Sequence, residues 1–268
     1  MGVIVMHPLD GPRLKVQRAE RQLQAYRQAE QAFVKKAQYK IVKAEFNPKT
    51  GKNVYRVRES VPPPLEWGAW LGEIAHDLRS ALDGLAWQLA LLNPGEPFEY
   101  TGFPICIVGR GKTKVIGGRR YGPFWRRDKR APLQSVDRHL WTRIEAFQPY
   151  KRGNGGRHSP LFLLHELNNT DKHRLIQVVG IKSGVFSWSG WGDDVEHPSF
   201  ATSRPVVLKD GAKFCELSPR ATMLSDLIPL IAFSEGCPAV KNRTVHLTLR
   251  RILERVSEIV ESFEPEFA

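Results

Sequence analysis

The chain of 268 residues is 41% hydrophobic and 25% charged, a composition that excludes an intrinsically disordered protein. Its three cysteines, at positions 106, 215 and 237, form no Cys-x-x-Cys pair, which argues against a zinc ribbon or a disulfide scaffold and indicates a reducing compartment. No apolar run approaches the roughly 18 residues of a membrane span, so we expect a soluble cytoplasmic protein, and the formal net charge of +12 indicates an anionic partner.

The N-terminal part of the sequence predicts two long helices separated by a β-hairpin. Residues 9–37 carry a sparse apolar stripe at helical spacing. Two runs of β-favouring residues, 38–46 and 53–59, flank an Asn-Pro-Lys-Thr-Gly-Lys turn and predict a hairpin within residues 38–60. The strongest helical pattern follows over residues 65–92 and ends at Asn-Pro-Gly.

The helix predicted over residues 65–92 has a broad apolar side and a narrow polar face opposite it. His76, Arg79, Asp83 and Trp87 fall within about 60° of one another on that polar face. The spacing places an imidazole, a guanidinium and a carboxylate side by side, an arrangement suited to acid–base chemistry on a phosphodiester. The alternative is an i,i+4 ion pair between Arg79 and Asp83 on a solvated face, with His76 incidental.

Positive charge is concentrated in residues 110–157, which hold fourteen Lys or Arg against three acidic residues and therefore carry a net charge of +11. The densest part, residues 119–130, interleaves cations with aromatic rings. We expect its cations to bind phosphates and its tryptophan to stack on bases, and the residues concerned are Arg119, Arg120, Trp125, Arg126, Arg127, Lys129 and Arg130. The alternative is a solvated loop whose arginines are neutralised by acids from elsewhere, with Phe124 and Trp125 in the core.

Two further helices are predicted near residues 133–147 and 160–169, and a dense polar turn follows the second of them. Because turns at element junctions often carry functional side chains, His173 is a further candidate catalytic residue. A turn capped by Asp171 with solvated neighbours is the alternative. The His-Glu-Leu-Asn-Asn stretch at 165–169 lacks the second histidine of a zinc motif, so we expect no metal site and no other cofactor.

The C-terminal part predicts strands closed by a helix. Short β-favouring runs are separated by Gly, Pro, Asp and Ser, and they cover residues 175–181, 184–188, 205–208, 213–217 and 227–233. Helical periodicity resumes over residues 239–263. This order of elements predicts an α+β fold, in which a helical region (residues 1–174) packs as one unit with a β-rich part and its C-terminal helix (residues 175–268).

Three short motifs resemble a group of uncharacterised bacterial, largely actinobacterial, proteins: Leu-Arg-Ser-Ala-Leu-Asp at 78–83, Phe-Pro-Ile at 103–105 and Asn-Thr-Asp-Lys-His-Arg at 169–174. The helix with the first motif in turn resembles the HEPN superfamily of helical nucleic-acid-associated domains, whose ribonuclease members carry an arginine and, after a short spacer, a histidine on one helix. The resemblance implies that Arg79 is the motif arginine and that the helical core is HEPN-like. Gly84 occupies the position where the histidine is expected.

These observations predict a nucleic-acid-binding protein of HEPN-like type, with RNA preferred over DNA. The prediction extends to a metal-independent ribonuclease of a toxin or defence system that uses His76, Arg79, Asp83 and His173. The alternative is a non-catalytic interaction component of a phage or defence system, whose basic segment docks on an acidic protein. A homodimer is one candidate assembly.

Overall fold

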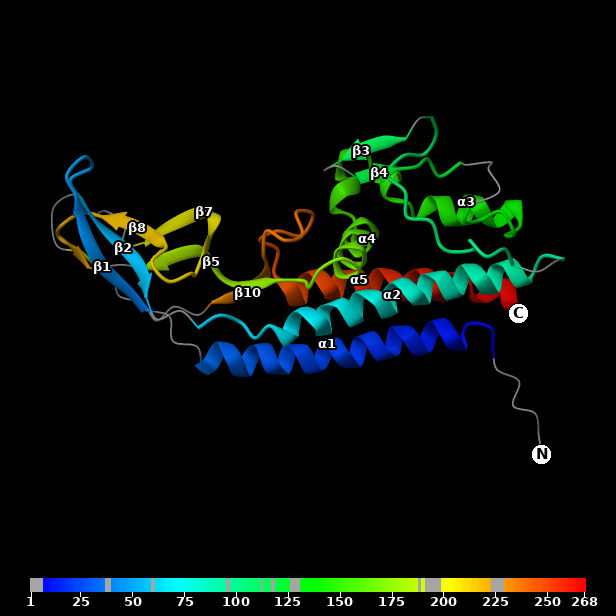
Figure 1. Cartoon of the computed structure of the whole chain (residues 1–268), viewed down its shortest axis with the longest axis horizontal. Helices are drawn as coiled ribbons and strands as arrows, with labels where there is room; N and C mark the ends of the chain where they lie inside the picture. The colour runs from blue at the N-terminus through cyan, green and yellow to red at the C-terminus, as the bar shows by residue number, and fades with distance from the viewer. Residues whose placement is uncertain are drawn as a thin grey trace.

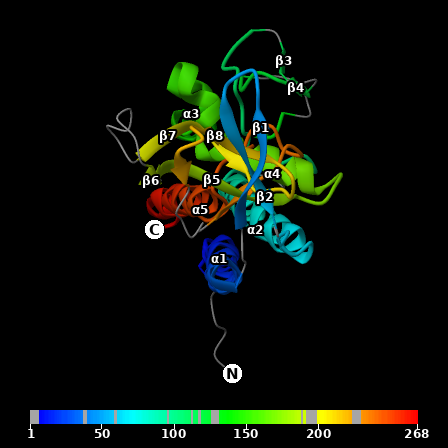
Figure 2. The same cartoon turned by 90° about the vertical axis from the view of Figure 1, so that its left-hand side faces the viewer.

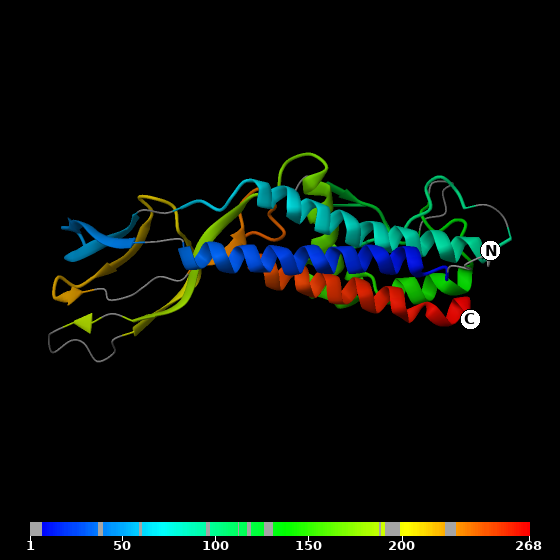
Figure 3. The ribbon, with the colours of Figure 1, turned by 90° about the horizontal axis from the view of Figure 1, so that it is seen from below.

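The computed structural model of the chain is an elongated α+β structure, as the sequence predicts (Figure 1). Long helices form a rod, and most of the strands gather at one end of it. The first long helix begins, and the last one ends, at the opposite end of the rod (Figure 3). The structure describes residues 7–36, 40–58, 61–94, 97–111, 113–116, 119–125, 131–187, 189–190, 199–222 and 229–268.

Three long helices lie side by side along the rod. Helix α1 (Asp10–Lys36) runs antiparallel to α2 (Glu66–Leu91) and α5 (Val245–Ser262), as Figure 3 shows. The apolar side predicted for the second helix is confirmed, because its large residues are at most 3% exposed: Trp67, Leu71, Ile74, Leu78, Leu82, Leu85 and Leu89. Glycine or alanine occupies the other buried positions of α2 except that of Asp77, and these small residues let neighbouring segments approach closely.

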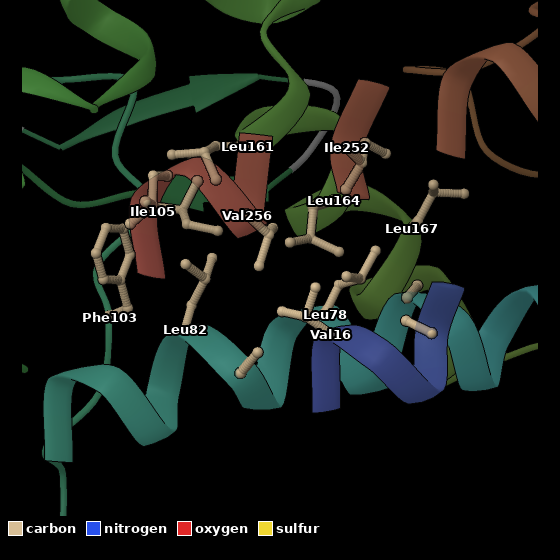
Figure 4. Packing of buried hydrophobic residues seen from close by; sticks show 14 of the residues in the cluster. Val16, Leu78, Leu82, Phe103, Ile105, Leu161, Leu164, Leu167, Ile252 and Val256 are labelled. Carbon is tan, nitrogen blue, oxygen red and sulfur yellow. The ribbon is translucent and has the colours of Figure 1, made fainter. Parts of the chain in front are cut away.

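Helix α4 (Pro160–Asp171) lies across α2 and α5 and completes the helical core. It begins at the predicted position because Ser159 caps it, with the side-chain oxygen accepting a hydrogen bond from the Phe162 N–H at 3.3 Å. Figure 4 shows Leu164 of α4 pointing into the space between α2 and α5. The same hydrophobic cluster extends to Phe103 and to residues of the final strand, so one core joins the two halves of the sequence.

The hairpin predicted within residues 38–60 is confirmed for residues 40–58, and its outermost residues lie outside the described ones. Strands β1 (Lys40–Asn47) and β2 (Lys52–Arg58) pair antiparallel around the Asn-Pro-Lys-Thr-Gly turn, where Gly51 has a φ of 67°. Strand β8 (Lys213–Leu217) joins the other edge of β2. The hairpin is therefore part of a three-stranded sheet with the C-terminal region.

The second three-stranded sheet has the order β10-β5-β7. The two runs predicted at 175–181 and 184–188 form a single strand, β5 (Val178–Ser187), in which the register against β7 (Ser199–Val207) shifts between Lys182 and Gly184. Strand β10 (Leu230–Phe233) pairs with the other edge of β5, and β6 (Ser189–Gly190) pairs with β9 (Ala221–Thr222).

The basic segment folds over the side of the α2–α5 layer opposite α1 (Figure 2). It contains a hairpin that the sequence analysis missed, formed by β3 (Lys114–Ile116) and β4 (Arg119–Tyr121), and then α3 (Arg138–Ala146) and the 3-10 helix η1 (Pro149–His158). Helix α3 begins later than the predicted residue 133, because the Asp137 side chain accepts a hydrogen bond from the His139 N–H and caps it.

The last helix also begins later than predicted. Residues 239–244 form turns, with Asn242 in the left-handed region at a φ of 62°, and α5 starts only after Thr244. The 3-10 helix η2 (Glu264–Phe267) follows it. Among the described residues, none of the helices combines the length and the apolar character needed to cross a bilayer.

Candidate nucleic-acid interface

Two residues on the polar face of α2 form hydrogen bonds with the connector, the segment around Phe103 that leads into the basic segment. Arg79 donates to both carboxylate oxygens of Asp83, from Nε at 3.0 Å and from Nη2 at 2.6 Å. The same Nη2 donates to the Phe103 carbonyl at 2.6 Å, and the Phe103 N–H donates to Asp83 Oδ1 at 2.9 Å. The i,i+4 ion pair that the sequence offered as an alternative is therefore present, and the pair fixes a loop about 20 residues further along the chain.

We call the Arg79–Asp83 pair and its hydrogen bonds to Phe103 the clamp. It holds the connector with one side in the core and the other beside a pocket. The connector's apolar side chains, Phe103 and Ile105, point into the core (Figure 4), where they are 0% and 9% exposed. Its backbone and the clamp border a pocket of about 420 Å³. The pocket is closed on its other sides by residues from the connector, β4 and α4, among them Tyr100, Arg120 and His165.

Strand β4 is anchored beside this pocket by a buried hydrogen bond. The Tyr121 hydroxyl donates to Glu166 Oε1 of α4 at 2.6 Å, and the two residues are 5% and 9% exposed. Arg120 precedes Tyr121 in the same strand. Its side chain is exposed and lines the pocket. The structure therefore brings Arg120 to the same pocket as the Arg79–Asp83 pair, which lies about 40 positions earlier in the sequence.

Most of the described cations of the basic segment have no acidic partner. Six of them are exposed, and no carboxylate of the described residues lies within 4.0 Å of any of the six: Arg110, Lys114, Arg120, Arg138, Arg152 and Arg157. Two others are paired, Arg143 with Glu266 and Lys151 with Glu145 at 3.1 Å. We call the six unpaired residues the cationic face. The alternative raised for residues 119–130 placed Phe124 and Trp125 in the core, and both pack there. Its neutralised arginines stay untested, because Arg120 is the one cation of that stretch whose side chain is described.

No protein-family model, curated protein or solved structure matches the chain. The assignment of function rests on the chemistry of its surface and pockets.

The predicted base-stacking residue, Trp125, is packed against the core. Its ring lies 5.4 Å from that of Phe124 and 5.7 Å from that of Trp141, and its Nε1 donates to Glu145 at 2.9 Å. Burial raises the pKa of Glu145, but hydrogen bonds from Tyr150, Trp125 and Lys151 outweigh it and hold that pKa below its usual value. The outer face of Trp125 carries the Arg110 guanidinium, 5.5 Å from the ring centroid.

Of the other predicted binding residues besides Arg120, one lies in a described strand and four lie outside the described residues. Arg119 lies in β4, next to Arg120. Arg126, Arg127, Lys129 and Arg130 lie outside the described residues. Sequence reasoning missed five members of the cationic face as individual binding residues, although all five belong to the segment whose charge it singled out: Arg110, Lys114, Arg138, Arg152 and Arg157.

His76 belongs to a second pocket, of about 530 Å³, between α1 and α2. Its Nε2 lies 3.4 Å from the Ser80 hydroxyl, and the side chain is exposed. The notable residue of this pocket is Asp77, which is 2% exposed and forms ion pairs with Lys15 at 3.4 Å and Arg18 at 3.2 Å of α1. The signal for Asp77 was available in the sequence, because a carboxylate falls on the apolar side of the helical pattern.

Asp171 reaches the same pocket from the end of α4. Its carboxylate packs against Gly72 of α2, where an added Cβ would lie 1.9 Å from Asp171 Oδ1. The pKa of Asp171 is raised above its usual value, chiefly by burial. The charge of Glu73 adds to this rise, and the charge of His76 opposes it. His173 lies in the exposed turn that follows, where its N–H donates to the Thr170 carbonyl at 3.1 Å.

The four residues predicted to act in catalysis are thus distributed over three places. Arg79 and Asp83 meet at the first pocket, His76 lines the second pocket, and His173 is exposed in the turn after α4. Within the described ranges, no group of three or more His, Cys, Asp or Glu side chains is arranged to hold a metal ion. Of the six residues of the cationic face, Arg120 also lines the first pocket.

Proposed function

We propose that the protein binds RNA, with the cationic face as the surface that contacts the phosphates. The observation that carries the proposal is the set of six exposed Lys and Arg side chains without a carboxylate within 4.0 Å among the described residues. Unpaired guanidinium groups suit phosphate oxygens, since their donors match the oxygens in pairs and no bound carboxylate must first be displaced. A surface of this kind releases counterions when it binds a nucleic-acid backbone.

The HEPN-like sequence of α2 supports RNA as the preferred nucleic acid and a toxin or defence system as the setting. The contacts of Arg79 support binding without cleavage. Its guanidinium is engaged by Asp83 and by the Phe103 carbonyl, and Gly84 stands where the second motif residue is expected. In this proposal Arg79 acts as a positioning residue that holds Asp83 and the Phe103 carbonyl at the pocket.

The salt dependence of binding tests the proposal. A labelled 20-nucleotide RNA is titrated with the full chain at 50 to 200 mM salt, and affinity is followed by fluorescence anisotropy. If all six cations each neutralise one phosphate, the log–log slope is about −4 for a single strand. Arg120→Ala and Arg138→Ala should each reduce the magnitude of the slope by about 0.7.

Arg250→Ala on α5 is the matched control, because Arg250 is an exposed arginine already paired with Glu254 at 2.8 Å. It should leave the slope unchanged. RNA binding whose affinity does not change with salt concentration would refute the proposal. A log–log salt slope of Arg120→Ala equal to that of the wild type would also refute it. Salt-insensitive capture of an acidic protein instead of RNA would identify the chain as the docking component that the sequence analysis offered as its alternative.

Cleavage is tested with the same RNA. The ribonuclease prediction requires cleavage in the presence of a metal chelator, and equal loss of cleavage in His76→Ala and His173→Ala. RNA that is bound and stays intact restricts the protein to binding.

A further inference from the structure

The first pocket and the cationic face share one residue, Arg120. A nucleic-acid strand that places a phosphate at Arg120 therefore passes the pocket. The pocket volume of about 420 Å³ lies in the range of small-molecule sites. This location offers space for one group that projects from the strand.

The charges around the pocket match a nucleotide better than a free phosphate. Arg120 supplies a cation without a described carboxylate partner, whereas Asp83 and Glu99 place two carboxylates in the lining. A free phosphate in the pocket would face both carboxylates. A nucleotide can instead keep its phosphate at Arg120 and direct the N–H donors of its base toward a carboxylate oxygen, a contact that bases make with acidic side chains. Asp83 is 40% exposed even while it holds Arg79.

One exposed aromatic ring lines the pocket, and a second lies on the same face of α2 as Asp83. Tyr100 lines the pocket and is 49% exposed. Trp87 is 43% exposed and lies one helical turn beyond Asp83 on the same face of α2. Flat rings of this kind stack on unpaired bases of any type. Bases of a duplex are already stacked and paired, so a duplex cannot use either the rings or the pocket.

We infer that the pocket bounded by Arg120, Tyr100 and the Arg79–Asp83 pair receives one unpaired nucleotide, which makes the protein selective for single-stranded RNA over duplex RNA. The inference rests on the proposed function, since it requires the strand to follow the cationic face. In it, Arg120 binds the phosphate, Tyr100 stacks on the base, and Asp83 accepts a hydrogen bond from the base edge.

The test compares a labelled 20-nucleotide single strand with the same strand annealed to its complement. Wild-type protein should bind the single strand at least tenfold more tightly at equal salt. Tyr100→Ala should weaken single-strand binding by about 5- to 140-fold, the value of one base–aromatic stack, and leave duplex binding unchanged. Tyr100→Phe, which keeps the ring, should bind the single strand like the wild type.

Phe46→Ala is the matched control, because Phe46 is a 55% exposed aromatic residue on β1, at the other end of the molecule. It should leave both affinities unchanged, and thermal unfolding confirms that each variant is folded. Equal wild-type affinity for single strand and duplex, or an equal loss of both in Tyr100→Ala, would overturn the inference while leaving the proposed function in place. Absence of salt-dependent binding to either RNA would instead overturn the proposed function.

Discussion

Replacement of Asp83 by alanine should destabilise the fold much more than the loss of an ordinary helix ion pair. The variant loses two hydrogen bonds from Arg79 and one from the Phe103 N–H. A hydrogen bond to a charged group contributes about 1.5–3 kcal/mol when it is buried, and solvent screening reduces this value here because Asp83 is 40% exposed. The 0% exposed Phe103 is then held less firmly in the core. We expect a loss of about 2–3 kcal/mol in the free energy of unfolding.

Urea unfolding measures this loss directly, and thermal unfolding should show a midpoint lower by about 5–10 °C. The chain provides a matched control in Arg250 and Glu254, which have the same i,i+4 spacing but are 61% and 55% exposed. Glu254→Ala should cost only about 0.3–0.5 kcal/mol. Equal losses in Asp83→Ala and Glu254→Ala would refute the reasoning, because the hydrogen bonds to the connector would then contribute nothing.

Further predictions concern two glycines and one half-buried carboxyl group. Gly72→Ala should lower the free energy of unfolding by about 1–3 kcal/mol, because the added Cβ would lie 1.9 Å from the Asp171 carboxylate. Gly84→Ala should raise the free energy of unfolding by about 0.5–1 kcal/mol, because its Cβ would meet only Pro12, at 3.5 Å. Urea unfolding measures both changes, and changes of the same sign would contradict these predictions. Burial raises the pKa of Glu30 from 4.5 to about 7, so the folded state favours the protonated carboxyl group. The folded state therefore loses stability as pH rises from about 4.5 to about 7, because the unfolded chain loses this proton first. Glu30→Gln should therefore gain stability relative to wild type between pH 5 and pH 8, and a constant difference across this range would disprove the cause.

The sequence was sufficient to predict elements whose signal is local. The spacing of leucines along α2 and the turn residues between β1 and β2 both specify structure through neighbours a few positions away. The basic segment was equally visible, since charge per unit length needs no knowledge of the fold. Errors at the starts of α3 and α5 arose where a capping Asp137 or a left-handed Asn242 outweighed apolar periodicity.

The candidate site was only partly predictable. Arg79 and Asp83 were recognised as a pair on one helix face, but their hydrogen bonds to Phe103 were not, because that contact joins residues about 20 positions apart. Asp77 was overlooked, since its partners lie on α1, about 60 residues earlier.

Amino-acid order by itself determined the helices, the hairpin and the concentration of positive charge, because each depends on short-range spacing or on composition. Tertiary structure alone decided which charges meet. It placed Arg120 at the same pocket as the Arg79–Asp83 pair, kept His76 in a different pocket, and left six described cations of the basic segment without a carboxylate within 4.0 Å. The physical reason is that the electrostatic environment of a side chain is set by groups within a few ångströms, whatever their separation along the chain.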